Sequence, residues 1–353
     1  MKIPLLASDV AAFWHSQGCF ATKMPPLVLW NTQRRGNKFL GQRIIPILPG
    51  GIFMIKGLIS PVLTPFNDDL TVADDLYLAL AKRLLETGGC AGLAPFGTTG
   101  EALSVGIEER IAALDCLIDG GIDPSVMIPG TGLTNLIDTA RLTRHAVERG
   151  CAGAMILPAF YFKGVSDEGL FDYFSRLIAM VDHPDLKIYL YHIPQVSGVG
   201  LSIPLVRRLH ETFPDCVVGI KDSSGDWDNT KALLEIKSLI TYPGSELPVI
   251  DAIRMGAPGC ISATANLNGN GISTVIEHCH KGQWDDAEQA HATVKSIRML
   301  FQDYAPIPAQ KALLSRATGD TRWNNLRPPL MAMPEENVIA LENELKTQFG
   351  FSV

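Results

Sequence analysis

The stretch VVGIKDSSGD, residues 217–226, joins a run of β-branched and apolar residues to a lysine and then to a turn of serine and glycine. Such a run, followed by such a turn, is typical of a short buried strand. An ammonium group at the mouth of an apolar strand loses hydration, which eases formation of the nucleophilic free amine. An isolated lysine at the end of a strand is more often an ordinary surface residue than a nucleophile, so the interpretation of Lys221 depends on the rest of the chain.

Apolar runs of strand length alternate with amphipathic segments of helix length from Lys56 onward. The runs are apolar throughout, which is typical of parallel strands covered on both faces. Three short segments that begin and end with glycine, 89–92, 150–153 and 256–259, each lie between a predicted helix and the next predicted strand. This internal repetition favours a closed barrel over an open doubly wound sheet. In an open sheet, residues 130–132 would be the start of a dinucleotide-binding loop. The third glycine that is typical of dinucleotide-binding loops is lacking here, which argues against this alternative. The predicted strands are 57–64, 92–96, 126–130, 154–158, 188–192, 217–221, 240–244 and 260–264.

The pattern therefore predicts an α/β fold, a (β/α)8 TIM barrel over residues 54–282. Further helices are expected at 283–301, 309–317 and 335–347, so 283–353 is predicted to pack on the barrel as a C-terminal helical extension. Residues 1–53 differ in kind, with basic residues, one acid and prolines that would break an amphipathic targeting helix. We interpret them as a disordered or artefactual extension before Met54, with a targeting segment as the alternative. The extension is expected to be dispensable.

Composition and charge exclude several classes of protein. The 353 residues are 46% hydrophobic and 19% charged, and the net charge of −7 supplies no basic surface for nucleic acid. No stretch approaches the ~18 apolar residues of a membrane span. Seven cysteines without a C-x-x-C pair indicate reduced thiols and a cytoplasmic protein. His278, Cys279 and His280 are adjacent, so on a helix they point in different directions and predict no metal site.

Unusual residues cluster where the predicted strands end, which is the active face of a barrel. Residues 97–101, GTTGE, follow the second strand, and their hydroxyl and N–H groups suit a carboxylate. Tyr191 ends the fifth strand, one strand–helix unit before Lys221, and a tyrosine beside such a lysine can relay protons. An aromatic segment with Tyr161 follows the fourth strand.

Three motifs in register, at 97–101, 191–198 and 219–226, resemble the dihydrodipicolinate synthase / N-acetylneuraminate lyase family of pyruvate-dependent aldolases. The resemblance covers about residues 54–345 and implies a homotetramer made of tight dimers. By matching position it implies that Lys221 forms the Schiff base, Tyr191 acts as acid and base, Thr98 relays protons, and a partner subunit lends Tyr161. It implies substrate contacts at Thr99, Gly97, Gly100, Ser223, Gly244, Glu246 and His192.

The implied chemistry needs no cofactor, because a covalent imine on Lys221 draws electrons from the substrate so that a C–C, C–O or C–H bond can break. The partner is then a 2-oxo acid, with pyruvate as product or substrate. Val196 stands where lysine-pathway synthases of the family carry an arginine, which favours the lyase branch. Members of the lyase branch bind sugar hydroxyls with an Asp-Glu pair, and this chain has Glu246 and Leu247 at those two positions. His192 stands where the branch usually has an asparagine.

We therefore expect an aldolase or dehydratase acting on a 2-keto-3-deoxy sugar acid or a related catabolic 2-oxo acid. One alternative is condensation of pyruvate with an aldehyde, as in 4-hydroxy-tetrahydrodipicolinate synthase. A second is a barrel that binds an oxo acid without catalysis.

Overall fold

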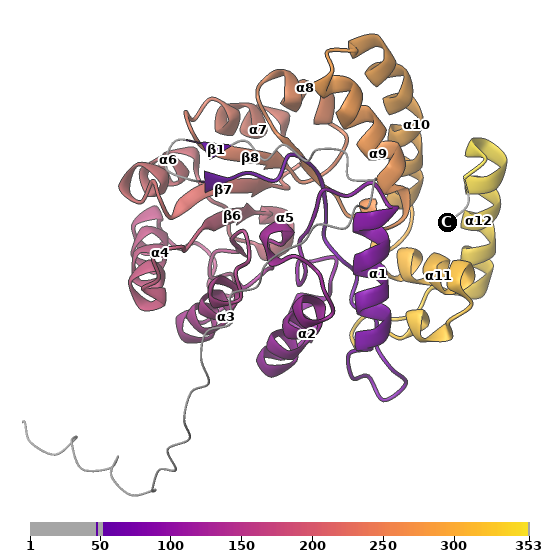
Figure 1. Cartoon of the computed structure of the whole chain (residues 1–353), viewed down its shortest axis with the longest axis horizontal. Helices are drawn as coiled ribbons and strands as arrows, with labels where there is room; N and C mark the ends of the chain where they lie inside the picture. The colour runs from indigo at the N-terminus through magenta and orange to yellow at the C-terminus, as the bar shows by residue number, and fades with distance from the viewer. Residues whose placement is uncertain (1–46, 49–51, 352–353) are drawn as a thin grey trace, which may run out of the picture. The chain divides into compact units, whose positions relative to one another are not determined.

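Parallel strands surrounded by helices form the core of the molecule (Figure 1). The computed structural model describes residues 47–48 and 52–351, which belong to one compact unit. Its first elements, β1 (Ile47–Leu48) and β2 (Ile52–Phe53), pair antiparallel. The rest of the predicted extension 1–53 lies outside the described residues.

The parallel strands form two ladders, with the orders β4-β3-β9 and β5-β6-β7-β8. The segment predicted as the third strand, 126–130, is not a ladder strand, which corrects that prediction. It makes only single bridges, from Met127 to Leu93 and from Gly130 to Met155. Pro129 has no N–H to donate, so a continuous ladder cannot form there. The segment still joins the two ladders. The strands are β3 (Gly57–Ser60), β4 (Gly92–Leu93), β5 (Ala154–Ile156), β6 (Ile188–His192), β7 (Val217–Asp222), β8 (Ile240–Pro243) and β9 (Gly259–Ile261).

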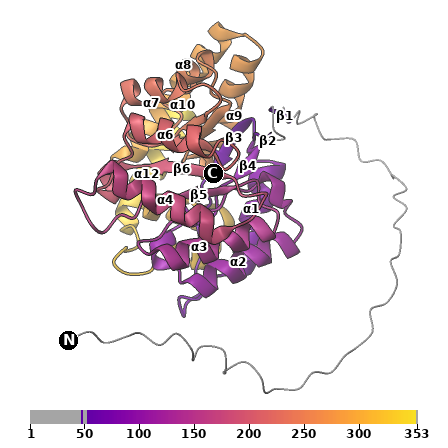
Figure 2. The same cartoon turned by 90° about the vertical axis from the view of Figure 1, so that its left-hand side faces the viewer.

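Helices lie between successive strands and cover their outer side (Figure 2). Polar caps set several of the starts, because the side chains of Asn135, Ser166, Ser202 and Asp226 accept hydrogen bonds from the first turns of α3, α4, α6 and α7. The helices are α1 (Asp74–Glu86), α2 (Ile107–Asp119), α3 (Leu136–Glu148), α4 (Asp167–Val181), α5 (Pro194–Ser197), α6 (Ile203–Thr212), α7 (Trp227–Leu234), α8 (Val249–Arg254) and α9 (Ala265–His280), with 3-10 turns at Ala102–Ser104, Pro124–Val126 and Thr321–Asn324.

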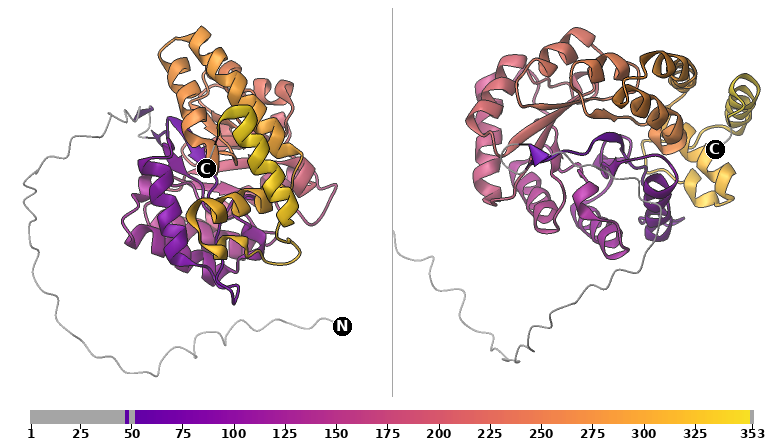
Figure 3. Two further views of the ribbon diagram at one scale, coloured as in Figure 1. Left: turned by 90° about the vertical axis from the view of Figure 1, so that its right-hand side faces the viewer. Right: turned by 45° about the horizontal axis from the view of Figure 1, so that its top comes forward.

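Three more helices follow the last strand: α10 (Trp284–Gln302), α11 (Pro306–Thr318) and α12 (Glu335–Phe349). Figure 3 shows α11 and α12, in yellow, outside the helices that surround the strands. They share a buried apolar cluster that includes Phe301, Leu313 and Leu341. Helix α11 begins three residues before its predicted start, because proline is tolerated in the first turn of a helix. The fold class predicted from the sequence, a TIM barrel with C-terminal helices, is confirmed.

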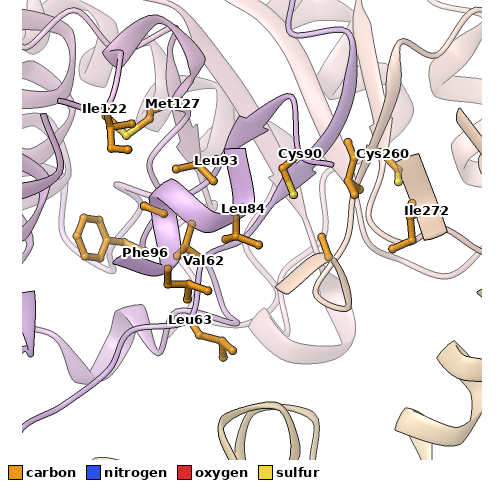
Figure 4. Packing of buried hydrophobic residues seen from close by; sticks show 14 of the residues in the cluster. Val62, Leu63, Leu84, Cys90, Leu93, Phe96, Ile122, Met127, Cys260 and Ile272 are labelled. Atoms are coloured by element: carbon orange, nitrogen blue, oxygen red, sulfur yellow. The ribbon is translucent and has the colours of Figure 1, made fainter. Parts of the chain in front are cut away.

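Apolar side chains fill the space between the strands and the surrounding helices. Figure 4 shows part of one cluster, in which Leu93 of β4 and Cys260 of β9 meet Leu84 of α1 and Ile272 of α9. All four are at most 1% exposed. Burial of this extent is worth roughly 1.5–3 kcal/mol for each large aliphatic side chain. This packing holds the strand ends at fixed positions. Within the described part of the chain, none of the helices has the length and apolar character needed to cross a membrane.

Candidate active site

Lys221 and Tyr191 face each other at the carboxyl ends of neighbouring strands. The parallel register of β6 and β7 places them side by side. The phenol oxygen of Tyr191 lies 3.3 Å from Lys221 Nζ and 3.2 Å from the hydroxyl of Thr98. Lys221 is 4% exposed and Tyr191 is 3% exposed, so little water competes for these contacts. The three groups form a continuous path along which a proton can move between amine, phenol and hydroxyl.

The turn 97–101 after β4 presents unused donors next to this path. The N–H groups of Thr98 and Thr99 donate no hydrogen bond to any residue that the structure describes. Phe96 and Glu101, which flank the two threonines, have left-handed backbones with φ of 57° and 53°. Residues with side chains adopt this conformation at a cost, and it is often found at functional sites. Adjacent free N–H groups of this kind suit an anion such as a carboxylate.

A cavity of about 750 Å³ lies over Lys221. Its wall also contains residues that the motifs did not single out, including Trp227 of α7 and Lys295 and Arg298 of α10. Six of the predicted site residues line the cavity: Thr98, Thr99, Tyr191, Lys221, Ser223 and Gly244.

Two of the predicted glycines are needed because other atoms approach their backbone. A Cβ on Gly244 would lie 2.0 Å from Ser223 Oγ, and one on Gly100 would lie 2.7 Å from the backbone oxygen of Val62. Both distances are too short for any side chain. Gly97 lines a second cavity and has room for a Cβ, whose nearest neighbour would be 3.5 Å away.

The second cavity, of about 470 Å³, adjoins the first at Thr98 and Tyr191. Val196 lines it and is 61% exposed. Tyr161 follows β5 on a loop and is 74% exposed, with its ring edge-on to Phe162. Within one chain, Tyr161 therefore contacts neither Thr98 nor Tyr191 through a hydrogen bond.

Two predicted contact residues lie away from both cavities. The carboxylate of Glu246 is fully buried and accepts hydrogen bonds from the hydroxyls of Ser262 and Thr264. The imidazole of His192 accepts the Leu201 N–H at Nδ1 over 2.9 Å, and burial lowers its pKa. In this arrangement both side chains are hydrogen-bonded to other parts of the chain, and neither lines one of the two cavities.

Asp222, for which the sequence pattern predicted no role, positions the turn that follows Lys221. Its carboxylate accepts hydrogen bonds from the Thr230 hydroxyl at 2.7 Å, the Asn229 amide at 3.1 Å and the Ser224 N–H at 2.9 Å. These bonds fix the backbone beside the lysine. The Lys-Asp-Ser-Ser turn was the available signal, because aspartate commonly bonds the N–H two residues on.

Glu101 and Lys311 form an ion pair in which both side chains are completely buried. Glu101 ends the turn 97–101, and Lys311 lies on α11, so the pair ties the C-terminal helices to the turn that lies beside Tyr191. The lysine also donates to the backbone oxygen of Asn325 over 3.0 Å. Burial raises the pKa of Glu101 and lowers that of Lys311, while the opposite charge of each partner counteracts the shift. No motif identified this pair.

Removing one partner of the pair should destabilise the protein strongly. Lys311→Met leaves the Glu101 carboxylate buried without its cation, a change that costs about 3–5 kcal/mol. Arg316 lies on the same helix as Lys311, and Arg316→Met, which breaks an exposed pair with Glu335 of α12, should cost less than about 1 kcal/mol. Denaturant unfolding measures both free energies. Equal losses in the two variants would contradict a special role for the buried pair.

Among the described residues, no group of three or more His, Cys, Asp or Glu side chains is arranged to hold a metal ion. His278, Cys279 and His280 lie in the last turn of α9, and in the part of the chain that the structure describes they belong to no such group.

Comparison with known proteins gives consistent matches. The family model described as the dihydrodipicolinate synthetase family matches residues 54–348. An uncharacterized DapA-like lyase of Chloroflexus aurantiacus is 34% identical over 287 residues, which cover 81% of this chain and 94% of that protein. The crystal structure of dihydrodipicolinate synthase from Agrobacterium tumefaciens is 34% identical, with a TM-score of 0.76 over 83% of this chain and 99% of that one. The crystal structure of YagE, a prophage protein from E. coli K12 in complex with pyruvate, is 26% identical, with a TM-score of 0.76 over 83% and 98%.

Proposed function

The chain belongs to the dihydrodipicolinate synthetase family, whose members are class I aldolases and related lyases, and on this premise we propose that it cleaves a 2-oxo acid through a Schiff base on Lys221. The proposed reaction is an aldol cleavage or a dehydration, and the proposed substrate is a 2-keto-3-deoxy sugar acid or a related catabolic 2-oxo acid. No external cofactor takes part.

The observation that carries the proposal is the hydrogen-bonded path from Lys221 through Tyr191 to Thr98 within one cavity. The Lys221 amine adds to the substrate C2 carbonyl, and Tyr191 delivers the proton that turns the resulting hydroxyl into departing water. The N–H groups of Thr98 and Thr99 hold the substrate carboxylate next to C2. Because these groups are in place before substrate arrives, little reorganisation is needed during the reaction.

The iminium then accepts an electron pair from the substrate. Loss of the C4 hydroxyl proton breaks the C3–C4 bond in an aldol cleavage. Loss of a C3 proton followed by departure of a hydroxyl gives dehydration. Tyr191, whose phenol oxygen lies 3.3 Å from Lys221 Nζ, is the proposed acid and base in either route.

A panel of 2-keto-3-deoxy sugar acids tests the reaction type. Pyruvate release and water loss are measured separately for each compound, by a coupled enzyme assay and by mass spectrometry. Turnover of at least one compound in either channel is expected. If the protein forms the imine but turns over none of the compounds, the alternative of a barrel that binds an oxo acid without catalysis would be favoured.

One finding favours a second candidate, condensation of pyruvate with an aldehyde. The Agrobacterium protein that is 34% identical is a dihydrodipicolinate synthase. Val196 argues against this reaction, because its apolar side chain cannot pair with the carboxylate of a second substrate. Pyruvate consumption that depends on an added amino-acid aldehyde, with no cleavage of sugar acids, would decide for the synthase.

We further propose that Tyr161 completes the site of a partner subunit in a homotetramer, and that the enzyme is cytoplasmic. The observation that supports the shared tyrosine is the exposed aromatic loop beside the second cavity. Lys163 holds this loop in position through hydrogen bonds to the backbone oxygens of Phe160 and Ser197. A hydroxyl inserted next to Thr98 would extend the proton path.

Mixed assemblies should reveal a tyrosine shared in this way. Tyr161→Phe chains and Lys221→Ala chains, each inactive alone, are expected to regain partial activity when mixed and reassembled. Some sites in the mixture then draw an intact Lys221 and an intact Tyr161 from different chains. Activity no greater than the sum of the two parents would remove Tyr161 from the site.

A further inference from the structure

Two cationic side chains, Lys295 and Arg298, lie in the wall of the cavity over Lys221. Helix α10 contributes Lys295, Arg298, Met299 and Gln302 to this wall. Their spacing of three, four and seven residues places them on one face of the helix. Lys295 is exposed and Arg298 is half-buried. Neither forms an ion pair with any residue in the described part of the chain.

Arg298 is left unsatisfied as well as unpaired. Its Nε atom is buried and has no hydrogen-bond partner among the described residues. A buried donor on a charged group costs free energy unless something accepts its hydrogen bond. Because Arg298 also lines the cavity, a ligand that enters the cavity could accept the hydrogen bond that this donor lacks.

The carboxylates in the same wall are already engaged elsewhere. Asp226 caps α7 by accepting the Asp228 N–H over 3.0 Å, and Asp251 pairs with Arg254 over 3.1 Å. Asp222 holds the turn after Lys221, as described above. The cavity therefore contains the unused N–H groups of 97–101 and, on α10, a second group of donors with which no carboxylate of the described residues forms an ion pair.

We propose that the substrate carries a second anionic group, a carboxylate or a phosphate, at the end remote from its 2-oxo acid, and that Arg298 binds this group with help from Lys295. The inference rests on the proposed function, because it assumes that the 2-oxo acid end is bound at Lys221. Arginine suits the role because its planar guanidinium donates two parallel hydrogen bonds to a carboxylate or a phosphate.

The second anion does not enter the bond-breaking step. In an aldol cleavage the C3–C4 electron pair moves to the iminium, and the C4 hydroxyl loses its proton to become the aldehyde. The enamine then takes a proton at C3, and water releases pyruvate from Lys221. The anionic group leaves on the aldehyde product, so Arg298 acts on substrate choice and orientation.

Three compounds that differ only at C6 test the inference: 2-keto-3-deoxygluconate with a hydroxyl, 2-keto-3-deoxyglucarate with a carboxylate, and 2-keto-3-deoxy-6-phosphogluconate with a phosphate. The full-length enzyme is expected to have a kcat/KM at least about 10-fold higher for one or both anionic compounds than for the neutral one. The preferred anion identifies the group. Arg298→Gln should reduce this preference by about 10- to 100-fold, Arg298→Lys should restore part of it, and Arg316→Gln should keep it.

The proposed function is checked separately by trapping pyruvate on Lys221 with borohydride in each variant. If none of the three compounds is cleaved, each is instead tested as an inhibitor of pyruvate trapping. The anionic compounds should then inhibit at lower concentrations than the neutral one, and Arg298→Gln should reduce this difference. A neutral compound that is preferred, or a preference that Arg298→Gln leaves intact, would overturn the inference even where trapping succeeds. Failure of trapping in all variants would overturn the proposed function itself.

Discussion

Lys221→Met is expected to abolish turnover while the fold remains intact. Methionine has nearly the same length and fills the same buried volume beside Tyr191, but it has no amine to form the imine. Loss of the nucleophile from a covalent catalyst lowers kcat on the order of 10⁶-fold. Steady-state turnover of the best compound in the sugar-acid panel measures the effect, and circular dichroism with thermal melting checks the fold.

The control is Lys231→Met, which removes an exposed lysine from α7. This variant should keep its turnover within about twofold, since surface substitutions away from special features change little. If Lys221→Met retained more than about a thousandth of the wild-type rate, another group would have to supply the nucleophile.

Tyr191→Phe is expected to lower kcat by about 10²- to 10⁴-fold, the range for loss of a general acid or base. The ring still packs at the end of β6, but the hydroxyl that contacts both Lys221 Nζ and Thr98 is gone. Imine formation should be at least partly retained, because the amine and the carboxylate-binding turn are unchanged. Single-turnover kinetics would separate the two steps.

The same strand provides a matched control. Tyr189 lies two residues earlier, and its hydroxyl is buried without a hydrogen-bond partner in the described structure. Tyr189→Phe removes an equivalent hydroxyl that touches neither the lysine nor the cavity, so kcat should change little. Near wild-type turnover in Tyr191→Phe, or an equal loss in both variants, would show that another group moves the proton.

The sequence allowed the barrel and the meeting of Lys221 with Tyr191 to be predicted, because both follow from short-range patterns. Apolar runs fix where the strands lie, and parallel strands bring their carboxyl ends to one face. One local pattern misled: residues 126–130 are apolar enough for a strand, but Pro129 cannot donate to a ladder.

The remaining features depend on contacts between distant parts of the chain. Glu101 and Lys311 are 210 positions apart, and nothing near either residue marks it as paired. Arg298 lies in a helix whose pattern predicts packing but does not show which side chains reach the cavity. Glu246 was placed among the substrate contacts by its position after β8, yet two hydroxyls from the segment after β9 occupy its carboxylate.

The residue that forms the imine with pyruvate can be identified directly. The intact protein is incubated with pyruvate and sodium borohydride, digested, and mapped by mass spectrometry. One reduced pyruvate adduct per chain is expected on Lys221, and none is expected in Lys221→Met. An adduct on a different lysine, or no adduct in protein that turns over its substrate, would contradict this expectation.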